Sequence, residues 1–189
     1  MDLTSYADLA VRLVNSAEPS RRDDGLASVD SYRALVEDRP QLAGKVTTND
    51  LETLRLLRDE FRQVFAAAAR QDDSEVAERL NALLTRHPIH QQLTSHDGKP
   101  WHVHLVDSGS AADRHAAGAI AGLTGLIAES GTARMGTCAA DGCERVFIAA
   151  GAAADKPYCS ERCAPKANVH ALRAPGRSSN QGPPSTAVS

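Results

Sequence analysis

The feature that most constrains this chain of 189 residues is a group of four cysteines confined to positions 138–163. Cys138 and Cys143 form one close pair, Cys159 and Cys163 form a second, and 15 residues separate the pairs. Two close pairs joined by a short loop are typical of a tetrahedral zinc site made of four thiolates. A closed site of this kind has no open coordination position, so we expect one structural Zn²⁺ ion without a catalytic role.

Two alternatives for the cysteines stay open, namely two disulfides or thiols that are redox-active or unliganded. Disulfides require an oxidising compartment, and the start at residues 1–4 lacks the basic segment of a secretory signal. No apolar run approaches the roughly 18 residues of a membrane span. We therefore expect a cytoplasmic protein with no membrane partner, in which zinc binding supplies most of the folding energy of the cysteine module.

Upstream of the cysteines, apolar residues recur at helical spacing and indicate five helices. The segments lie near residues 6–14, 26–36, 51–70, 72–84 and 111–130. Ser5 and Asp8 resemble a capping box for the first helix, and we expect Asn49 to cap the third. Gly131 should end the last helix.

Between the fourth and fifth of these helices, the apolar period changes from 3.6 to 2 and predicts a β-hairpin over residues 89–106. An Asp-Gly pair near its middle is typical of a hairpin turn. A connection of odd length places Leu93 opposite Val103 and Thr94 opposite His102, which keeps one face apolar. We prefer this register for that reason.

The predicted hairpin also contains histidines and a tryptophan that could have a function. His90, His102 and His104 should share its polar face, where imidazoles can bind a metal or another ligand or respond to pH. A solvated polar face is the simpler interpretation, and the ligand site is the alternative. We expect Trp101 to anchor the other face in the core.

Composition supports a mainly α fold with one small hairpin, because aromatic residues make up only 4% of the chain and much of the apolar share is alanine. We expect a helical N-terminal domain over residues 1–131 that includes the hairpin. A four-cysteine zinc module, treble-clef-like or zinc-ribbon-like, should follow over residues 134–173. Residues 174–189 are rich in Pro, Gly and Ser and should form a disordered tail.

The cysteine module resembles the CGNR zinc finger in the order of its parts. After the first cysteine pair come Val146-Phe147-Ile148, a loop of small residues, Tyr158-Cys159-Ser160 and a last cysteine. That family places the finger after a helical domain named ABATE, and residues 50–58 resemble a helix of that domain. The resemblance covers most of residues 1–173, although the Cys-Gly-Asn-Arg signature is replaced by Cys163-Ala164-Pro165-Lys166.

The resemblance implies a stress-induced transcription regulator, in which the helical domain senses a ligand or partner and the finger contacts DNA. Its basic run after the last cysteine is diluted here. The residues that we expect to contact DNA are Lys166, His170, Arg173 and Arg177.

Charge sets a limit on this DNA-binding interpretation. Residues 1–133 hold 14 Lys and Arg against 20 Asp and Glu, whereas residues 134–189 have a net charge of +3. Four thiolates around Zn²⁺ lower the charge of the module to about +1. DNA affinity rests mainly on phosphate neutralisation, so we expect weak binding by a monomer and stronger binding by a homodimer.

The alternative is a protein–protein interaction module with purely structural zinc and no DNA binding. We do not expect an enzyme. The sequence has no HExxH, no GxSxG and no glycine-rich phosphate loop, which are the motifs that would indicate catalysis.

Overall fold

The computed structural model describes residues 3–18, 23–95, 101–105, 109–149 and 157–163. Within these ranges the chain forms a 3-10 turn, η1 (Leu3–Tyr6), and five α-helices: α1 (Ala7–Asn15), α2 (Val29–Leu35), α3 (Thr48–Ala69), α4 (Asp73–Arg86) and α5 (Ala111–Ser130). The described strands form three antiparallel pairs: β1 (Ala17–Glu18) with β2 (Asp23–Asp24), β3 (Gln91–Thr94) with β4 (His102–Leu105), and β5 (Met135–Thr137) with β6 (Val146–Ile148). The prediction of a mainly helical fold with a small hairpin and a C-terminal cysteine module is confirmed.

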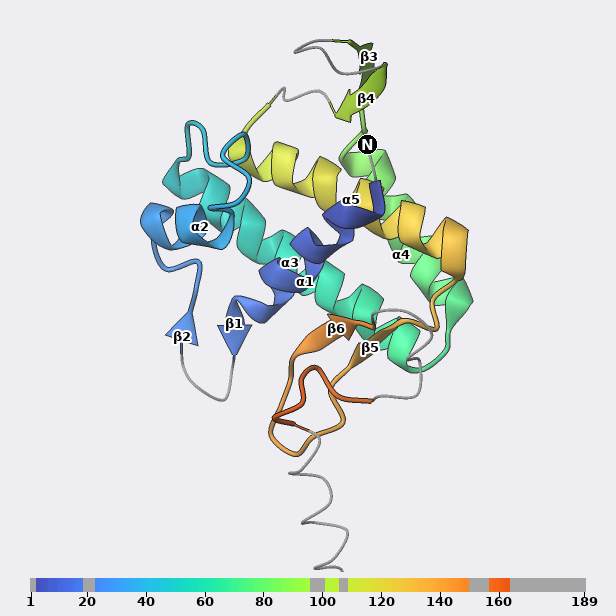
Figure 1. Ribbon diagram of the computed structural model, residues 1–189. Helices are drawn as coiled ribbons and strands as arrows, with labels where there is room; N and C mark the ends of the chain where they lie inside the picture. The colour runs from blue at the N-terminus through green and yellow to red at the C-terminus, as the bar shows by residue number, and fades with distance from the viewer. Residues whose placement is uncertain (1–2, 19–22, 96–100, 106–108, 150–156, 164–189) are drawn as a thin grey trace, which may run out of the picture.

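Helix α3 runs through the middle of the molecule, with α1, α4 and α5 packed around it and β5 against its C-terminal half (Figure 1). Its apolar residues recur every three or four positions and therefore form one continuous face. That face is buried in the core and includes Leu54, Leu57, Phe61, Val64 and Phe65. No helix in the described part of the chain is long and apolar enough to cross a membrane.

The cap of α3 is Thr47 and not Asn49, so that prediction is wrong by two positions. The backbone N–H of Thr47 donates to Asp50 at 2.8 Å, and the N–H of Asp50 donates back to the Thr47 hydroxyl at 3.3 Å. Asp50 also accepts from the N–H of Ala112 at 3.2 Å, which ties the start of α5 to the start of α3. Burial alone would raise the pKa of Asp50, but these hydrogen bonds hold it below the usual value.

The capping box expected at Ser5 is also absent. Tyr6 stands at the N-cap of α1 and makes no side-chain cap, because η1 leads directly into the helix. The carboxylate of Asp8, which the box required, instead forms ion pairs with Arg12 at 3.0 Å and Arg39 at 2.8 Å. A pair within α1 and a tertiary pair with Arg39 therefore engage the carboxylate that the cap required.

Helix α5 packs unusually close to the N-terminal helix, and glycine makes this possible. A Cβ atom at Gly122 would lie 2.1 Å from the backbone nitrogen of Ala7, a distance that no side chain could occupy. The helix ends at Gly131 as predicted, with a positive φ of 69°. The small residues of α5 thus bring its backbone against η1 and α1.

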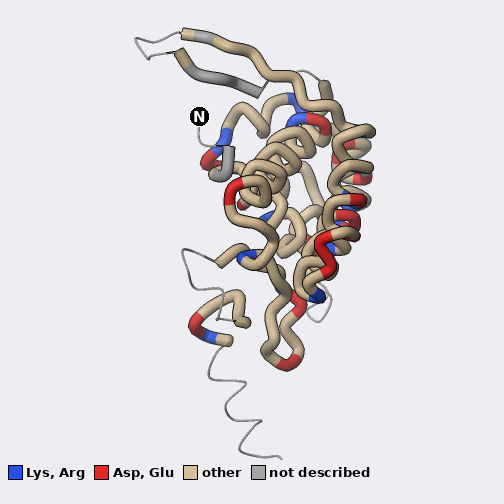
Figure 2. The backbone as a smooth tube through the Cα atoms, turned by 90° about the vertical axis from the view of Figure 1, so that its right-hand side faces the viewer, with Lys and Arg blue, Asp and Glu red and all other residues tan. Residues whose placement is uncertain are grey.

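The hairpin of β3 and β4 has the predicted register, with Leu93 opposite Val103 and Thr94 opposite His102. It extends from one end of the helical body, as two perpendicular views show (Figures 1 and 2). Trp101 is 71% exposed and Leu93 is 64% exposed, so the expectation that Trp101 anchors the core is wrong. The alternating pattern determined which residues share a face, but the helices already fill the core without that face.

One histidine lies entirely inside the helical core. His115 on α5 is fully buried, with Nε2 at 3.3 Å from the carbonyl of Leu9 and Nδ1 at 3.4 Å from the hydroxyl of Tyr32. The neutral ring satisfies both contacts when Nε2–H donates to Leu9 and Nδ1 accepts from Tyr32. Burial lowers the pKa of His115 to about 4.

We predict that acid destabilises the protein through this residue. Unfolded His titrates near pH 6.5. Below that pH the unfolded chain binds a proton, whereas folded His115 stays neutral down to about pH 4. Stability is therefore complete above pH 6.5 and falls by about 3 kcal/mol as the pH drops to 4. Urea denaturation at several pH values should show a shallower pH dependence for His115→Gln. His90→Gln, at an exposed position, is the control and should behave as the parent does. An identical pH dependence in parent and His115→Gln would contradict the prediction.

Candidate metal centre

The first cysteine pair lies on the turn between β5 and β6. Cys138 directly follows β5, and Arg145 directly precedes β6. The N–H of Cys138 donates to the carbonyl of Arg145 at 2.8 Å, which joins the two ends of the turn. The chain reverses through Gly142, whose φ of 70° lies in the left-handed region where glycine is favoured. The N–H of Cys143 then donates to the carbonyl of Ala140 at 3.0 Å. This tight turn brings Cys143 back beside Cys138.

The second pair lies on another tight turn, in which the N–H of Cys163 donates to the carbonyl of Ser160 at 3.0 Å. Two contacts join it to the first turn. The N–H of Ala139 donates to the carbonyl of Pro157 at 2.8 Å, and the N–H of Cys159 donates to the sulfur of Cys138 at 3.4 Å. The backbone therefore holds both turns face to face, as the spacing of the cysteines indicated.

All four sulfur atoms lie within 4.8 Å of one another. Cys159 Sγ lies 3.7 Å from the sulfurs of Cys143 and Cys163, and the latter two are 3.9 Å apart. Ligands about 2.3 Å from a tetrahedral zinc ion would be separated by about 3.8 Å. A disulfide has an S–S bond of about 2.05 Å, and the four cysteines here are free. The cluster therefore has the dimensions of a site that could hold a metal ion.

Burial and mutual proximity change the acidity of the thiols in the cluster. Burial, together with the neighbouring thiols, raises the pKa of Cys159 to about 12, and burial raises the pKa of Cys143 as well. The hydroxyl of Ser160 lies 3.6 Å from the sulfur of Cys163 and lowers the pKa of that thiol. Thiolates this close together repel one another, so a bound cation is what would favour their ionised form.

The cysteine module is joined to the helical body by one side chain of α1. Asn15 Nδ2 donates to the carbonyl of Val146 at 2.9 Å, and the N–H of Val146 donates to Asn15 Oδ1 at 2.9 Å. The amide thus occupies the backbone hydrogen bonds of β6 in the way that a neighbouring strand would. Sequence reasoning missed this contact, because the two residues are 131 positions apart and neither belongs to a motif.

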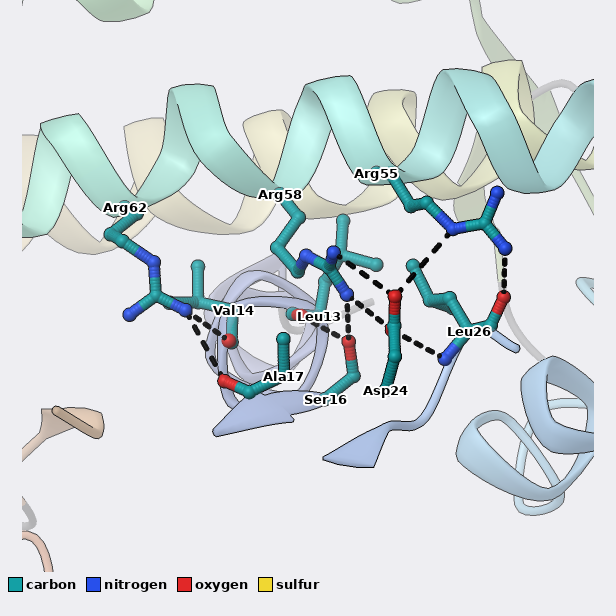
Figure 3. A network of polar contacts seen from close by, with 9 residues as sticks. All are labelled: Leu13, Val14, Ser16, Ala17, Asp24, Leu26, Arg55, Arg58 and Arg62. Carbon is teal, nitrogen blue, oxygen red and sulfur yellow. Dashed lines mark hydrogen bonds and ion pairs between the residues drawn. The ribbon is translucent and has the colours of Figure 1, made fainter. Parts of the chain in front are cut away.

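Arg62, one of three arginines in a row on α3, makes the second connection. Arg62 donates to the carbonyls of Val14 and Ala17 at 3.0 and 3.3 Å, and also to the carbonyl of Glu144 in the cysteine module at 3.2 Å. Figure 3 shows Arg62 beside Arg58 and Arg55 along the same side of the helix. Arg62 thereby links the end of α1, β1 and the first cysteine turn.

The other two arginines bind the segment that precedes α2 (Figure 3). Arg58 is only 8% exposed and donates to Asp24 at 2.6 Å, and Arg55 donates to the carbonyl of Leu26 at 2.6 Å. Burial alone would raise the pKa of Asp24, but the hydrogen bond from Arg58 holds it below its usual value. Both arginines therefore bind oxygens of the fold, and Arg58 is buried too deeply to contact an outside polyanion.

A pocket of about 470 Å³ opens at the joint between the helical body and the cysteine module. Val11 and Asn15 of α1 line one side, and Phe147 of β6 and Cys159 line another. Two cations, Arg134 and Arg145, also line it, and Arg134 Nε donates to the carbonyl of Ala149 at 2.8 Å. A molecule in this pocket would contact both parts of the protein at once.

The remaining predicted site residues are placed only in part. The DNA-contact candidates Lys166, His170, Arg173 and Arg177 lie outside the described residues. His90 is exposed just before β3, and His102 and His104 lie in β4 opposite Thr94 and Gln92, with their side chains outside the description. A ligand site made of these three histidines therefore stays a prediction, as do the domain bounds.

Comparison with known proteins gives one match. The model of a family named ABATE, described as a "putative stress-induced transcription regulator", matches residues 7–155. The match includes the helical body, the hairpin and the first cysteine pair, and it ends before Cys159. A search of curated proteins found no match.

We predict that the amide of Asn15 stabilises the docked module. In Asn15→Ala the N–H and carbonyl of Val146 lose their partners, which should lower the free energy of unfolding by about 2 kcal/mol. Urea denaturation of the metal-loaded protein measures this. Asn81→Ala, at an exposed position on α4, removes the same amide from the helix surface and is the matched control. Equal stability of the two variants would show that the contact does not contribute.

Proposed function

The chain belongs to the ABATE family, and from this premise we propose a zinc-binding transcription regulator in which a helical sensing domain is coupled to a DNA-contacting cysteine module. The observation that carries the proposal is the convergence of four sulfurs within 4.8 Å of one another, in a module that α1 and α3 hold against the helical body. The family description provides the regulatory role, and the sulfur cluster provides the metal chemistry. We propose no catalytic role and a cytoplasmic location, where thiols stay reduced.

Zinc is the metal that best fits the four ligands. Thiolates are soft donors that suit zinc, whereas magnesium and calcium take oxygen ligands. Cys138, Cys143, Cys159 and Cys163 would together fill the tetrahedron and leave no position for a substrate. The ion would hold the two cysteine turns together, which are otherwise joined by few contacts.

The sensing role rests on the joint between the two parts. The pocket at the joint places α1, β6 and a cysteine within reach of one molecule. Arg134 and Arg145 are cations for an anionic group, and the one carboxylate among the described lining residues, Asp8, is already paired with Arg12 and Arg39. A ligand shifts a conformational equilibrium only if it binds the two states differently. A ligand that contacts both sides of this joint meets that requirement, because it binds best when the module is docked in one position.

The DNA-contacting role falls to the residues after the last cysteine, Lys166, His170, Arg173 and Arg177. Arg55, Arg58 and Arg62 do not contribute, because the fold already uses their guanidinium groups. Weak binding by a single chain follows from the low net charge of the zinc-loaded module. The same low charge favours the second candidate function, a protein-interaction module in which zinc only stabilises the fold.

We predict one zinc ion per chain, bound by all four cysteines. Native mass spectrometry should show this ion, and Cys143→Ser should lower zinc affinity and the melting temperature together, because a ligand is lost and binding energy is folding energy. Thr137→Ser, next to Cys138 and exposed, is the control that should retain the ion. A protein that takes up no zinc under reducing conditions would contradict the metal assignment.

We predict salt-dependent binding of random duplex DNA that depends on the basic residues after Cys163. The double variant Lys166→Ala and Arg173→Ala should reduce the slope of log affinity against log salt by about 2, because each phosphate contact contributes roughly 0.9. Fluorescence anisotropy over a salt series measures the slope.

The control for this experiment is the double variant Arg33→Ala and Lys45→Ala, which removes two exposed cations from the helical body. Its slope should equal that of the parent. If the zinc-loaded parent forms no complex at low salt, the DNA-binding role is wrong and the protein-interaction module becomes the better function.

A further inference from the structure

The β3–β4 hairpin exposes apolar surface that the proposed function does not use. Three large apolar side chains are exposed among the described residues, and two of them, Leu93 and Trp101, lie on this hairpin. Leu93 is opposite Val103, and Trp101 lies two positions before Val103, so the register places Leu93 and Trp101 on the same face. An apolar face on a projecting element is a candidate contact surface.

The edges of the hairpin are also unprotected. Neither strand is paired with a third strand in the described part of the chain, and two-stranded hairpins are only marginally stable alone. Natural edge strands usually avoid pairing through charged residues, proline or bulges. Residues 89–95 and 101–105 contain no Lys, Arg, Asp, Glu or Pro, and the pairing of β3 with β4 runs without a bulge.

We propose that the hairpin is a dimerisation surface, on which a second copy of this chain adds its own hairpin edge to edge. The result is a four-stranded antiparallel sheet with Leu93 and Trp101 of both copies on its apolar face. A two-fold axis perpendicular to the sheet pairs an edge strand antiparallel with its own copy, so the interface is self-complementary.

Charge favours a second copy as the occupant. The chain carries a net charge of −3, so two copies repel each other over most of their surface. The described strands of the hairpin, residues 89–95 and 101–105, contain no Lys, Arg, Asp or Glu, and the segment between them holds one of each sign, Asp97 and Lys99, so two copies can align these strands without like charges facing each other. The hairpin also lies at the opposite end of the molecule from the cysteine module, so this dimer leaves both modules free (Figure 1).

The size of the surface determines how tight the dimer is. The exposed parts of Leu93 and Trp101 from two chains amount to on the order of 500 Å², whereas stable interfaces bury about 1,200 Å² or more. Backbone hydrogen bonds along the new strand pair add to this contact. The dimer should therefore be reversible, with monomer and dimer both populated at micromolar concentration.

The experiment uses the full chain and its single tryptophan, Trp101. Sedimentation equilibrium from low to high micromolar concentration should show the mass rising from one chain to two. The emission of Trp101 should shift to shorter wavelength over the same range, because pairing removes the indole from water. The two midpoints should coincide, since both report the same interface.

Two apolar residues of similar exposure supply the variant and its matched control. Leu93→Glu places two like charges at the interface between the two hairpins and should abolish the dimer. Leu93→Thr keeps strand propensity and should weaken the dimer less. Leu56→Glu introduces the same charge on α3, at a side chain that is 69% exposed, and should dimerise as the parent does.

Three outcomes would overturn the proposal. The first is a monomer at every concentration, with the emission of an exposed indole. The second is a monomer with short-wavelength emission, which would mean that residues of the same chain cover the hairpin. The third is a dimer that Leu93→Glu does not weaken, because it would then form through another surface.

Discussion

The fold depends on three guanidinium groups of α3 that bind backbone and carboxylate oxygens from distant parts of the chain. The nearly buried Arg58 forms an ion pair with the partly exposed Asp24, Arg55 binds the carbonyl of Leu26, and Arg62 joins the end of α1 to the cysteine module. Removing Asp24 would leave the nearly buried guanidinium of Arg58 without its partner, so this pair favours one arrangement of the elements that it joins. The apolar face of α3 supplies burial energy, and its arginine row determines where the segments between α1 and α2 lie.

The four-cysteine cluster depends on the same arrangement. Its first cysteine turn connects β5 to β6. The amide of Asn15 binds β6, and β5 packs against α3. Met135 and Val146 of this ribbon belong to the apolar core of the helical body. The cysteine turns therefore project from a base that is part of the main core, which connects the helices of this ABATE protein directly to its four-cysteine cluster.

Local patterns predicted much of this structure and failed where tertiary contacts competed with them. The helices, the end of α5 at Gly131 and the register of the hairpin follow from periodicity and turn residues. Asn49 was a reasonable cap by residue type, but Thr47 occupies the position because Asp50 binds both it and the start of α5. Trp101 was expected in the core because it is large and apolar, yet the alternation of a strand does not show whether another element covers its face.

The sequence by itself determined which four cysteines come together, because two cysteine pairs on tight turns can converge whatever lies upstream. It also determined which face of each helix is apolar, because the residues that a helix buries recur at a fixed period along the chain. Only the tertiary structure decided that Asn15 holds β6, that the arginines of α3 are consumed within the fold and that the hairpin is left uncovered. Each of these depends on which surfaces meet across long sequence separations, and no local pattern encodes that.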